Sequence, residues 1–162
     1  MGVVKSRISG SRGQSLAEFA LVVPIFILLM FMVIDFSRMV ESYVAIQHGA
    51  REGARYAVTG RSDCNLASPT RMSCIDQVAK QQTGPLNGGG VNVSVESWKF
   101  QSGGYAATPT ANSAGIQCDD VQVKVTYQYQ PLFPLVKSIF GSIPLTATER
   151  LVNEPFGACG TG

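Results

Sequence analysis

The amino-acid sequence predicts an α+β protein, in which a long N-terminal transmembrane helix continues outward and packs on a small antiparallel β-sheet. Two observations lead to this fold class. Residues 15–34 form a nearly uncharged apolar run within the 162-residue chain. Short segments with alternating apolar and polar residues follow, which is typical of half-buried strands. The chain therefore divides into a basic leader (1–13), a long helix (14–57) and one modest outer α+β domain (58–162).

The apolar run has the length of a membrane-spanning helix. About 20 residues, each rising ~1.5 Å, cross a hydrocarbon layer of ~30 Å, and residues 15–34 are twenty residues with one charge, Glu18. The basic residues Lys5, Arg7 and Arg12 come before it, which predicts a cytoplasmic N-terminus and an outer domain beyond the membrane. A cleaved secretory signal is the alternative. The run is too long for that class, and no small-x-small cleavage site ends it.

Two features mark the course of this helix. Pro24 lies inside the run and removes one backbone hydrogen bond, so it is either a harmless kink or a flexible point for packing into an assembly. Asp35 and Arg38 end the run, and their spacing of three residues predicts that they pair. No other strong helix breaker appears before Ala57, so the helix is predicted to continue to about that residue.

Small residues form a stripe on the outer half of the helix. Gly49, Gly53 and Ala57 recur at intervals of four and therefore share one helix face. Such a face permits close approach of another backbone, either a sheet or a second helix. A chance pattern in a stretch rich in small residues is the alternative.

The outer domain is predicted to hold three strands and a short helix. A loop follows the long helix, and the short helix after it is capped by Ser73 and ended by Gly84. The three strands are predicted at 91–100, 121–130 and 143–152. A turn at 84–90 precedes the first strand, and a small-residue loop at 101–120 connects the first to the second. The segment at 131–142, between the second and third strands, is predicted to be a short helix or a membrane-near hydrophobic corner. Since a lone sheet is marginally stable, the outer half of the long helix is expected to cover it.

All four cysteines, Cys64, Cys74, Cys118 and Cys159, lie after the apolar run. An even number on one side of a membrane segment indicates disulfides in an oxidising compartment. Three pairings exist, and nearness in sequence favours Cys64–Cys74 with Cys118–Cys159. Free or buried thiols are the alternative. A zinc site is less favoured, because no CxxC spacing occurs.

Charge and residue types argue against several function classes. The net charge is +2, and residues 14–162 carry ten basic and eleven acidic side chains, so no basic patch for nucleic acid is expected. The single histidine, His48, has no nucleophile and base beside it, and no glycine-rich phosphate loop follows a strand. We therefore expect no enzyme, no metal and no cofactor. His48 is expected to be a helix-surface or packing residue.

Glu18 is the one charge in the apolar run. A carboxylate at the centre of a membrane helix costs about 2.5–3.5 kcal/mol, and less near the edge, so Glu18 is in one interpretation simply hydrated at the boundary. In the other, a peptidase cuts after Gly13, and Gln14 gains a free α-amine. Glu18 would then be the fifth residue, and its carboxylate could pair with the amine of a neighbouring subunit in one axial register.

This stretch resembles the processing site of type IV prepilins, in which a dedicated peptidase cuts after the glycine and a glutamate is the fifth mature residue. GQSLAEF, which holds Gly13, Gln14 and Glu18, carries the resemblance. The pair Glu18–Phe19 is similar to the Flp/Tad branch. With AREGAR at residues 50–55, the helix resembles a TadE-like domain.

The resemblance implies a pilin-like fold and a minor pilin or pseudopilin of a tight-adherence (Tad) pilus system. Such a protein would be inserted in the bacterial inner membrane and cut by a prepilin peptidase between Gly13 and Gln14. Its partners would be other Tad pilins or pseudopilins and the assembly machinery, in a homo- or hetero-oligomer. Glu18 and Phe19 would serve assembly and register.

An unprocessed, single-pass anchored module for adhesion or binding is the alternative function. Its contact surface would be the loop from Gln101 to Gln117 together with Tyr127 and Tyr129, although packing in the sheet is the simpler role for both tyrosines. Retention of residues 1–13 on the mature protein would favour this function over the first.

Overall fold

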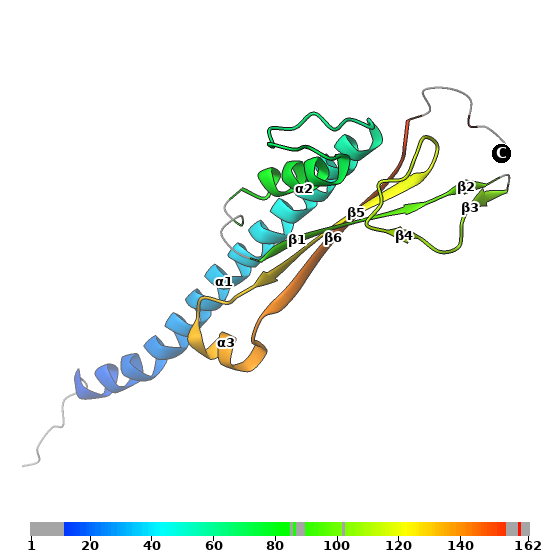
Figure 1. The fold of residues 1–162 in the computed structure, drawn as a ribbon. Helices are drawn as coiled ribbons and strands as arrows, with labels where there is room; N and C mark the ends of the chain where they lie inside the picture. The colour runs from blue at the N-terminus through cyan, green and yellow to red at the C-terminus, as the bar shows by residue number, and fades with distance from the viewer. Residues whose placement is uncertain (1–11, 85, 87–89, 102, 155–158, 160–162) are drawn as a thin grey trace, which may run out of the picture.

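The computed structural model describes residues 12–84, 86, 90–101, 103–154 and 159 (Figure 1). Most of the predicted leader and much of the predicted turn at 84–90 lie outside the described residues. Within them the predicted fold class is confirmed, because a long apolar N-terminal helix precedes a small antiparallel sheet. The elements in chain order are α1 (Arg12–Val58), α2 (Arg71–Gln82), β1 (Val91–Trp98), β2 (Phe100–Gln101), β3 (Gly104–Tyr105), β4 (Thr110–Ala111), β5 (Asp120–Tyr129), α3 (Pro134–Phe140) and β6 (Ile143–Val152).

Four strands form the main sheet in the order β4-β1-β5-β6, and neighbouring strands are antiparallel. β5 is central, with Val125 opposite Val93 on β1 and opposite Ala147 on β6. The predicted alternation is present, since Val123 and Val125 are fully buried while Lys124 between them is exposed. The sheet therefore has one apolar face and one polar face.

Two helices cover the apolar face of the sheet. In Figure 1 the outer half of α1 and α2 lie side by side over the strands, while the first half of α1 projects beyond them. We call residues 15–34 the rod and the described residues from 35 to 159 the head. The buried apolar residues of the head form one cluster, which consists of Ile46, Ala50, Ala54, Ala57, Ile75, Ala79, Val95, Ala114, Val121, Val123, Val125 and Ala147. Alanine and valine dominate it, so the elements pack at short distances.

The small-residue stripe of α1 faces α2 and β5. A Cβ atom at Gly49 would lie 2.7 Å from the backbone oxygen of Ala79 on α2. A Cβ atom at Gly53 would lie 3.1 Å from Cγ1 of Val123 on β5. Ala57, one turn further on, is fully buried. The two glycines therefore set the distance at which α1 packs on its neighbours.

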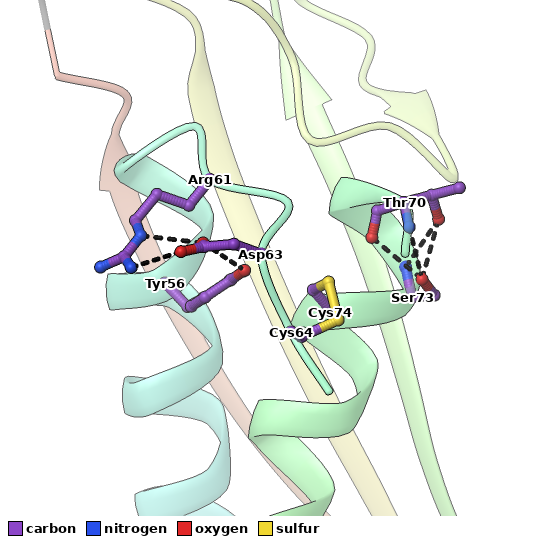
Figure 2. The surroundings of a disulfide bond; sticks show 7 residues. All are labelled: Tyr56, Arg61, Asp63, Cys64, Thr70, Ser73 and Cys74. Carbon is purple, nitrogen blue, oxygen red and sulfur yellow. Dashed lines mark hydrogen bonds and ion pairs between the residues drawn. A yellow bond between two sulfur atoms is a disulfide. The ribbon is translucent and has the colours of Figure 1, made fainter. Parts of the chain in front are cut away.

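Two predictions for the outer domain are wrong in detail. The N-cap of α2 is Thr70 and not Ser73: each hydroxyl accepts a hydrogen bond from the other residue's backbone N–H (Figure 2). The helix ends at Gln82, with Thr83 as its C-cap. The predicted loop at 101–120 contains β3 and β4, and β4 adds a fourth strand to the sheet by pairing with β1. Two-residue strands are too short to show an alternating pattern.

Gly49→Ala is expected to lower the free energy of unfolding of the head by about 1–3 kcal/mol, the usual cost of overpacking a core. On an exposed helix the same change would stabilise by about 0.8–1.0 kcal/mol. Here the new methyl would meet a backbone oxygen, which cannot rotate away. Urea unfolding of the full chain in detergent micelles, followed by circular dichroism, measures the difference. Gly103→Ala is the control, since a Cβ there meets nothing within 4 Å. Unchanged or higher stability of Gly49→Ala would contradict the packing described.

Candidate functional site

The predicted processing motif lies in the first turns of α1 and is open to solvent. Gly13 and Gln14 are exposed, and a Cβ atom at Gly13 would meet nothing within 4 Å. Within the part of the chain that the structure describes, packing therefore does not require glycine at position 13. Glu18 is exposed one turn later and accepts a 3.3 Å hydrogen bond from the side-chain amide of Gln14. Phe19 beside it is also exposed.

The rod has little cover from the rest of the chain. Its large apolar side chains from Leu16 to Ile34 are almost all exposed, and α1 continues through Pro24 without interruption. Within the described part of the chain, α1 is the one helix long and apolar enough to cross a membrane. An apolar rod of this length requires lipid, or the rods of other subunits, as its surroundings. These features indicate a single-pass membrane anchor.

The rod meets the head at Asp35, whose side chain lies under the segment before α3 and is only 7% exposed. Its two carboxylate oxygens accept hydrogen bonds from the backbone N–H groups of Leu132 (2.9 Å) and Phe133 (3.1 Å). Its backbone oxygen accepts a 2.9 Å hydrogen bond from the hydroxyl of Tyr129 at the end of β5. Asp35 therefore connects α1 to both β5 and α3 at the level where the apolar run stops.

The predicted pairing of Asp35 with Arg38 is wrong for the part of the chain that the structure describes. The carboxylate oxygens of Asp35 bind backbone N–H groups, whereas Arg38 is exposed and forms no ion pair with them. Hydrogen bonds from N–H groups to an ionised carboxylate are strong and suit a buried site, whereas an exposed ion pair contributes little. In the sequence, Asp35 is noticeable because it is the acidic residue at which the apolar run ends. That position does not identify the N–H groups to which its carboxylate binds.

Tyr129 and Phe133 complete the junction between rod and head. Tyr129 is buried, and its pKa is raised above the usual 10.0 by burial and by the nearby charge of Asp35, so it remains a hydrogen-bond donor at neutral pH. The ring of Phe133 stacks on Phe31 of the rod, with centroids 5.0 Å apart. Tyr127 is partly buried against the core. These contacts fit sheet packing, the simpler role for both tyrosines. The burial of Tyr129 argues against its part in the contact surface of the alternative function.

A half-buried arginine holds the opposite end of the head, and sequence reasoning did not identify it. Arg71 at the start of α2 donates 2.6 Å hydrogen bonds to the backbone oxygens of Ala57 and Gly115 and a 3.0 Å hydrogen bond to Oδ1 of Asn153. Burial lowers the pKa of Arg71, while the charge of Asp119 acts in the opposite direction. An arginine stays protonated at neutral pH. The guanidinium therefore joins α1, the loop before β5 and the residue after β6.

The four cysteines form two disulfides, Cys64–Cys74 and Cys118–Cys159, which is the pairing that nearness in sequence favours. The first joins the loop after α1 to a fully buried position in α2 (Figure 2). The second joins the loop before β5 to a position beyond β6. Both bonds lie in the head, which fits an oxidising compartment.

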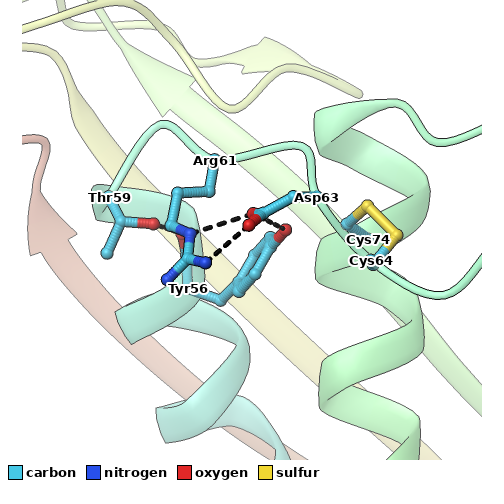
Figure 3. Close-up of polar contacts among 6 residues, drawn as sticks. All are labelled: Tyr56, Thr59, Arg61, Asp63, Cys64 and Cys74. Atoms are coloured by element: carbon cyan, nitrogen blue, oxygen red, sulfur yellow. Dashed lines mark hydrogen bonds and ion pairs between the residues drawn. A yellow bond between two sulfur atoms is a disulfide. The ribbon is translucent and has the colours of Figure 1, made fainter.

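Three side chains beside the first disulfide order the loop after α1 (Figure 3). Arg61 forms an ion pair with Asp63, and the hydroxyl of Tyr56 donates a long hydrogen bond of 3.5 Å to the same carboxylate. The hydrogen bond from Arg61 holds the pKa of Asp63 below its usual 3.8. Because both charged side chains are exposed, this contact orders a surface loop and does not resemble a reactive site.

Side chains that could bind a metal ion do not gather among the described residues. These residues include no group of three or more His, Cys, Asp or Glu that could hold one. His48 is exposed on the surface of α1. Its neighbours on the helix include Glu52 and Arg55, which form an exposed 3.8 Å ion pair. The features that distinguish this chain are therefore the rod, its N-terminal motif and the junction at Asp35.

Asp35→Ala is expected to lower the free energy of unfolding by about 1–3 kcal/mol, because two partly buried N–H groups lose their acceptor. Urea unfolding in micelles measures the total effect, and hydrogen exchange locates it at the amides of Leu132 and Phe133. Glu41→Ala removes an exposed acid from the same helix and should change stability by less than about 0.5 kcal/mol. If both amides exchange equally slowly in Asp35→Ala and in the parent protein, the carboxylate does not hold this segment.

Comparison with known proteins gives one result. Residues 13–55 match the model of a family described as TadE-like protein. The match extends from Gly13 through the rod and Asp35 to the AREGAR segment, and it confirms the resemblance seen in the sequence. No curated protein and no solved structure matches the chain.

Proposed function

Taking the TadE-like match of α1 as the premise, we propose that this chain is a minor pilin or pseudopilin of a Tad (Flp-type) pilus system, or an assembly factor of that system. The match itself indicates a protein associated with Tad pili. The observation that carries the subunit role is the division of α1, since its first half is an exposed apolar rod and its second half is core of the head. Such a rod can lie first in lipid and later among the rods of other subunits.

The proposed location is the bacterial inner membrane, with a single pass and a cytoplasmic N-terminus. Lys5, Arg7 and Arg12 precede the rod and would stay on the cytoplasmic side. The head would then lie outside the cytoplasm. Its two disulfides support that side, because such bonds persist in oxidising compartments.

The proposed processing step is cleavage by a prepilin peptidase between Gly13 and Gln14. Two facts support it: the site is exposed, and packing among the described residues does not require glycine at position 13. A residue without a Cβ lets an enzyme approach the backbone closely. Cleavage would remove the basic leader and leave an α-amine on Gln14, one helical turn from Glu18.

The proposed role of Glu18 is to set the axial register between subunits. Its carboxylate is exposed on the rod, where it would be costly in a dry environment without a partner. The α-amine of a neighbouring subunit would neutralise it in one register only. Phe19, also exposed, would add apolar contact with the same neighbour. The function is thus structural, and the partners are the membrane, the peptidase, and other Tad pilins and assembly proteins.

Intact-mass spectrometry of the protein from native membranes is expected to find a chain that begins at Gln14. Gly13→Leu should block cleavage, because a large side chain replaces the residue before the scissile bond, and its mass should include Lys5 and Arg7. A parent protein that keeps residues 1–13 in every copy would contradict processing and support the anchored binding module.

Glu18→Ala is expected to leave membrane insertion intact but to lower the amount of protein in the assembled complex by about tenfold or more. The reason is that removing one partner of a buried ion pair typically costs about 3–5 kcal/mol. Crosslinking followed by isolation of the pilus complex measures assembly, and resistance to carbonate extraction measures insertion. Glu41→Ala, which removes an exposed acid from α1 beyond the rod, is the control. Equal assembly of Glu18→Ala and the control would count against the register role.

A further inference from the structure

Large apolar side chains are exposed on and beside α3. Leu132 is 61% exposed, Ile139 is 73% exposed and Phe140 is 64% exposed. These side chains belong to one short segment that connects β5 to β6 at the foot of the sheet (Figure 1). Contiguous exposed apolar surface of this kind marks a contact with lipid or with another protein.

The height of α3 along α1 distinguishes these two partners. Phe133, the N-cap of α3, stacks on Phe31, which lies three residues before the last residue of the apolar run, Ile34. Three residues of helix correspond to ~4.5 Å, so Phe133 lies slightly below the predicted membrane boundary. The hydrogen bonds from Leu132 and Phe133 to Asp35 hold the segment at this height.

An apolar groove continues the lipid-facing surface of the rod into α3. It has a volume of about 200 Å³ and lies between α1, α3 and the adjoining ends of β5 and β6. Its apolar lining includes Met32, Phe36, Met39, Val136 and Phe140. Although Asp35 lines the groove, its carboxylate is directed to backbone N–H groups. The groove is therefore continuous with the rod and compatible with acyl chains.

The charges around α3 fit the edge of a bilayer. Lys137 is exposed on α3, and Arg38 is exposed on α1 one turn above Asp35. Long basic side chains can keep an apolar stem in lipid and place the charge among phosphate headgroups. The acidic group at this height, Asp35, is buried and hydrogen-bonded, so it does not face the headgroups.

We infer that α3 is a second membrane contact: it lies in the interface of the leaflet on the head's side, with Ile139 and Phe140 among the acyl chains. This inference rests on the proposed insertion of the rod. Contact at two points restricts how far the head can tilt over the membrane. It also means that extraction of the subunit must remove α3 from lipid together with the rod.

The test measures the depth of residue 139 in a membrane. The full chain carrying Ile139→Trp and Trp98→Phe is reconstituted in vesicles of phosphatidylcholine and phosphatidylglycerol with nitroxide-labelled lipid. The parent protein is the control, because Trp98 is its one tryptophan and lies opposite Asp120, nine residues along β5 from Tyr129. That separation is about 30 Å. Phe140→Trp in the same background provides a second position.

We expect the introduced tryptophan to lose about half of its emission to shallow nitroxides, because interfacial helices lie ~5–10 Å deep, while Trp98 keeps nearly all of its emission. Weak quenching at both positions, in protein that resists carbonate extraction, would overturn the contact by α3 but leave the membrane anchor standing. Iodide dissolved in the water quenches a tryptophan that is exposed to solvent. If the introduced tryptophan is protected from iodide only when the protein-to-lipid ratio is high, a second copy of the chain covers α3, and that result would overturn the lipid contact. Protein that carbonate removes would overturn both this inference and the proposed insertion.

Discussion

One continuous helix has to serve two environments, and Asp35 lies where they meet. Before it the side chains of α1 are exposed and apolar, and after it a face of α1 is buried in the head. A carboxylate at the edge of lipid is costly unless it is hydrogen-bonded. Here two backbone N–H groups satisfy it, and these same bonds fix the start of α3. The hydroxyl of Tyr129 adds the end of β5. Asp35 therefore links the rod to the sheet at the level where the two environments meet.

The features that depend on local pattern could be predicted from the sequence. Composition alone identified the rod, alternation identified β5, and the spacing of Gly49 and Gly53 identified the face of α1 that packs closely. Each of these signals is carried by side chains within a few turns or one strand of each other. The N-terminal motif was recognised by resemblance, and the family match covers it.

The role of Asp35 could not be predicted, for a physical reason. Its donors lie 97 and 98 positions away and are backbone N–H groups, which nearly every residue possesses. Local spacing suggested Arg38 instead, because a neighbouring charge is visible in sequence and a distant amide is not. The same limit applies to Arg71, whose acceptors include Asn153, 82 positions away. The choice of Thr70 over Ser73 as the N-cap also depended on backbone geometry, since both residue types suit that position.

The outer half of α1 and the central strand have matching lengths, which affects how the folded chain would respond to a pulling force. From Asp35 to Ala57 the helix rises about 33 Å, and β5 extends about 30 Å from Tyr129 to Asp120. At one end the hydroxyl of Tyr129 donates a hydrogen bond to the backbone oxygen of Asp35. At the other end Arg71 of α2 bridges the two, because it donates hydrogen bonds to Ala57 of α1 and to Gly115 in the loop before β5. A force that pulls along α1 would thus shear the whole interface between the helix and the sheet at once. All the contacts of that interface would resist the force together. A helix attached at a single end would instead peel away one turn after another under much weaker force.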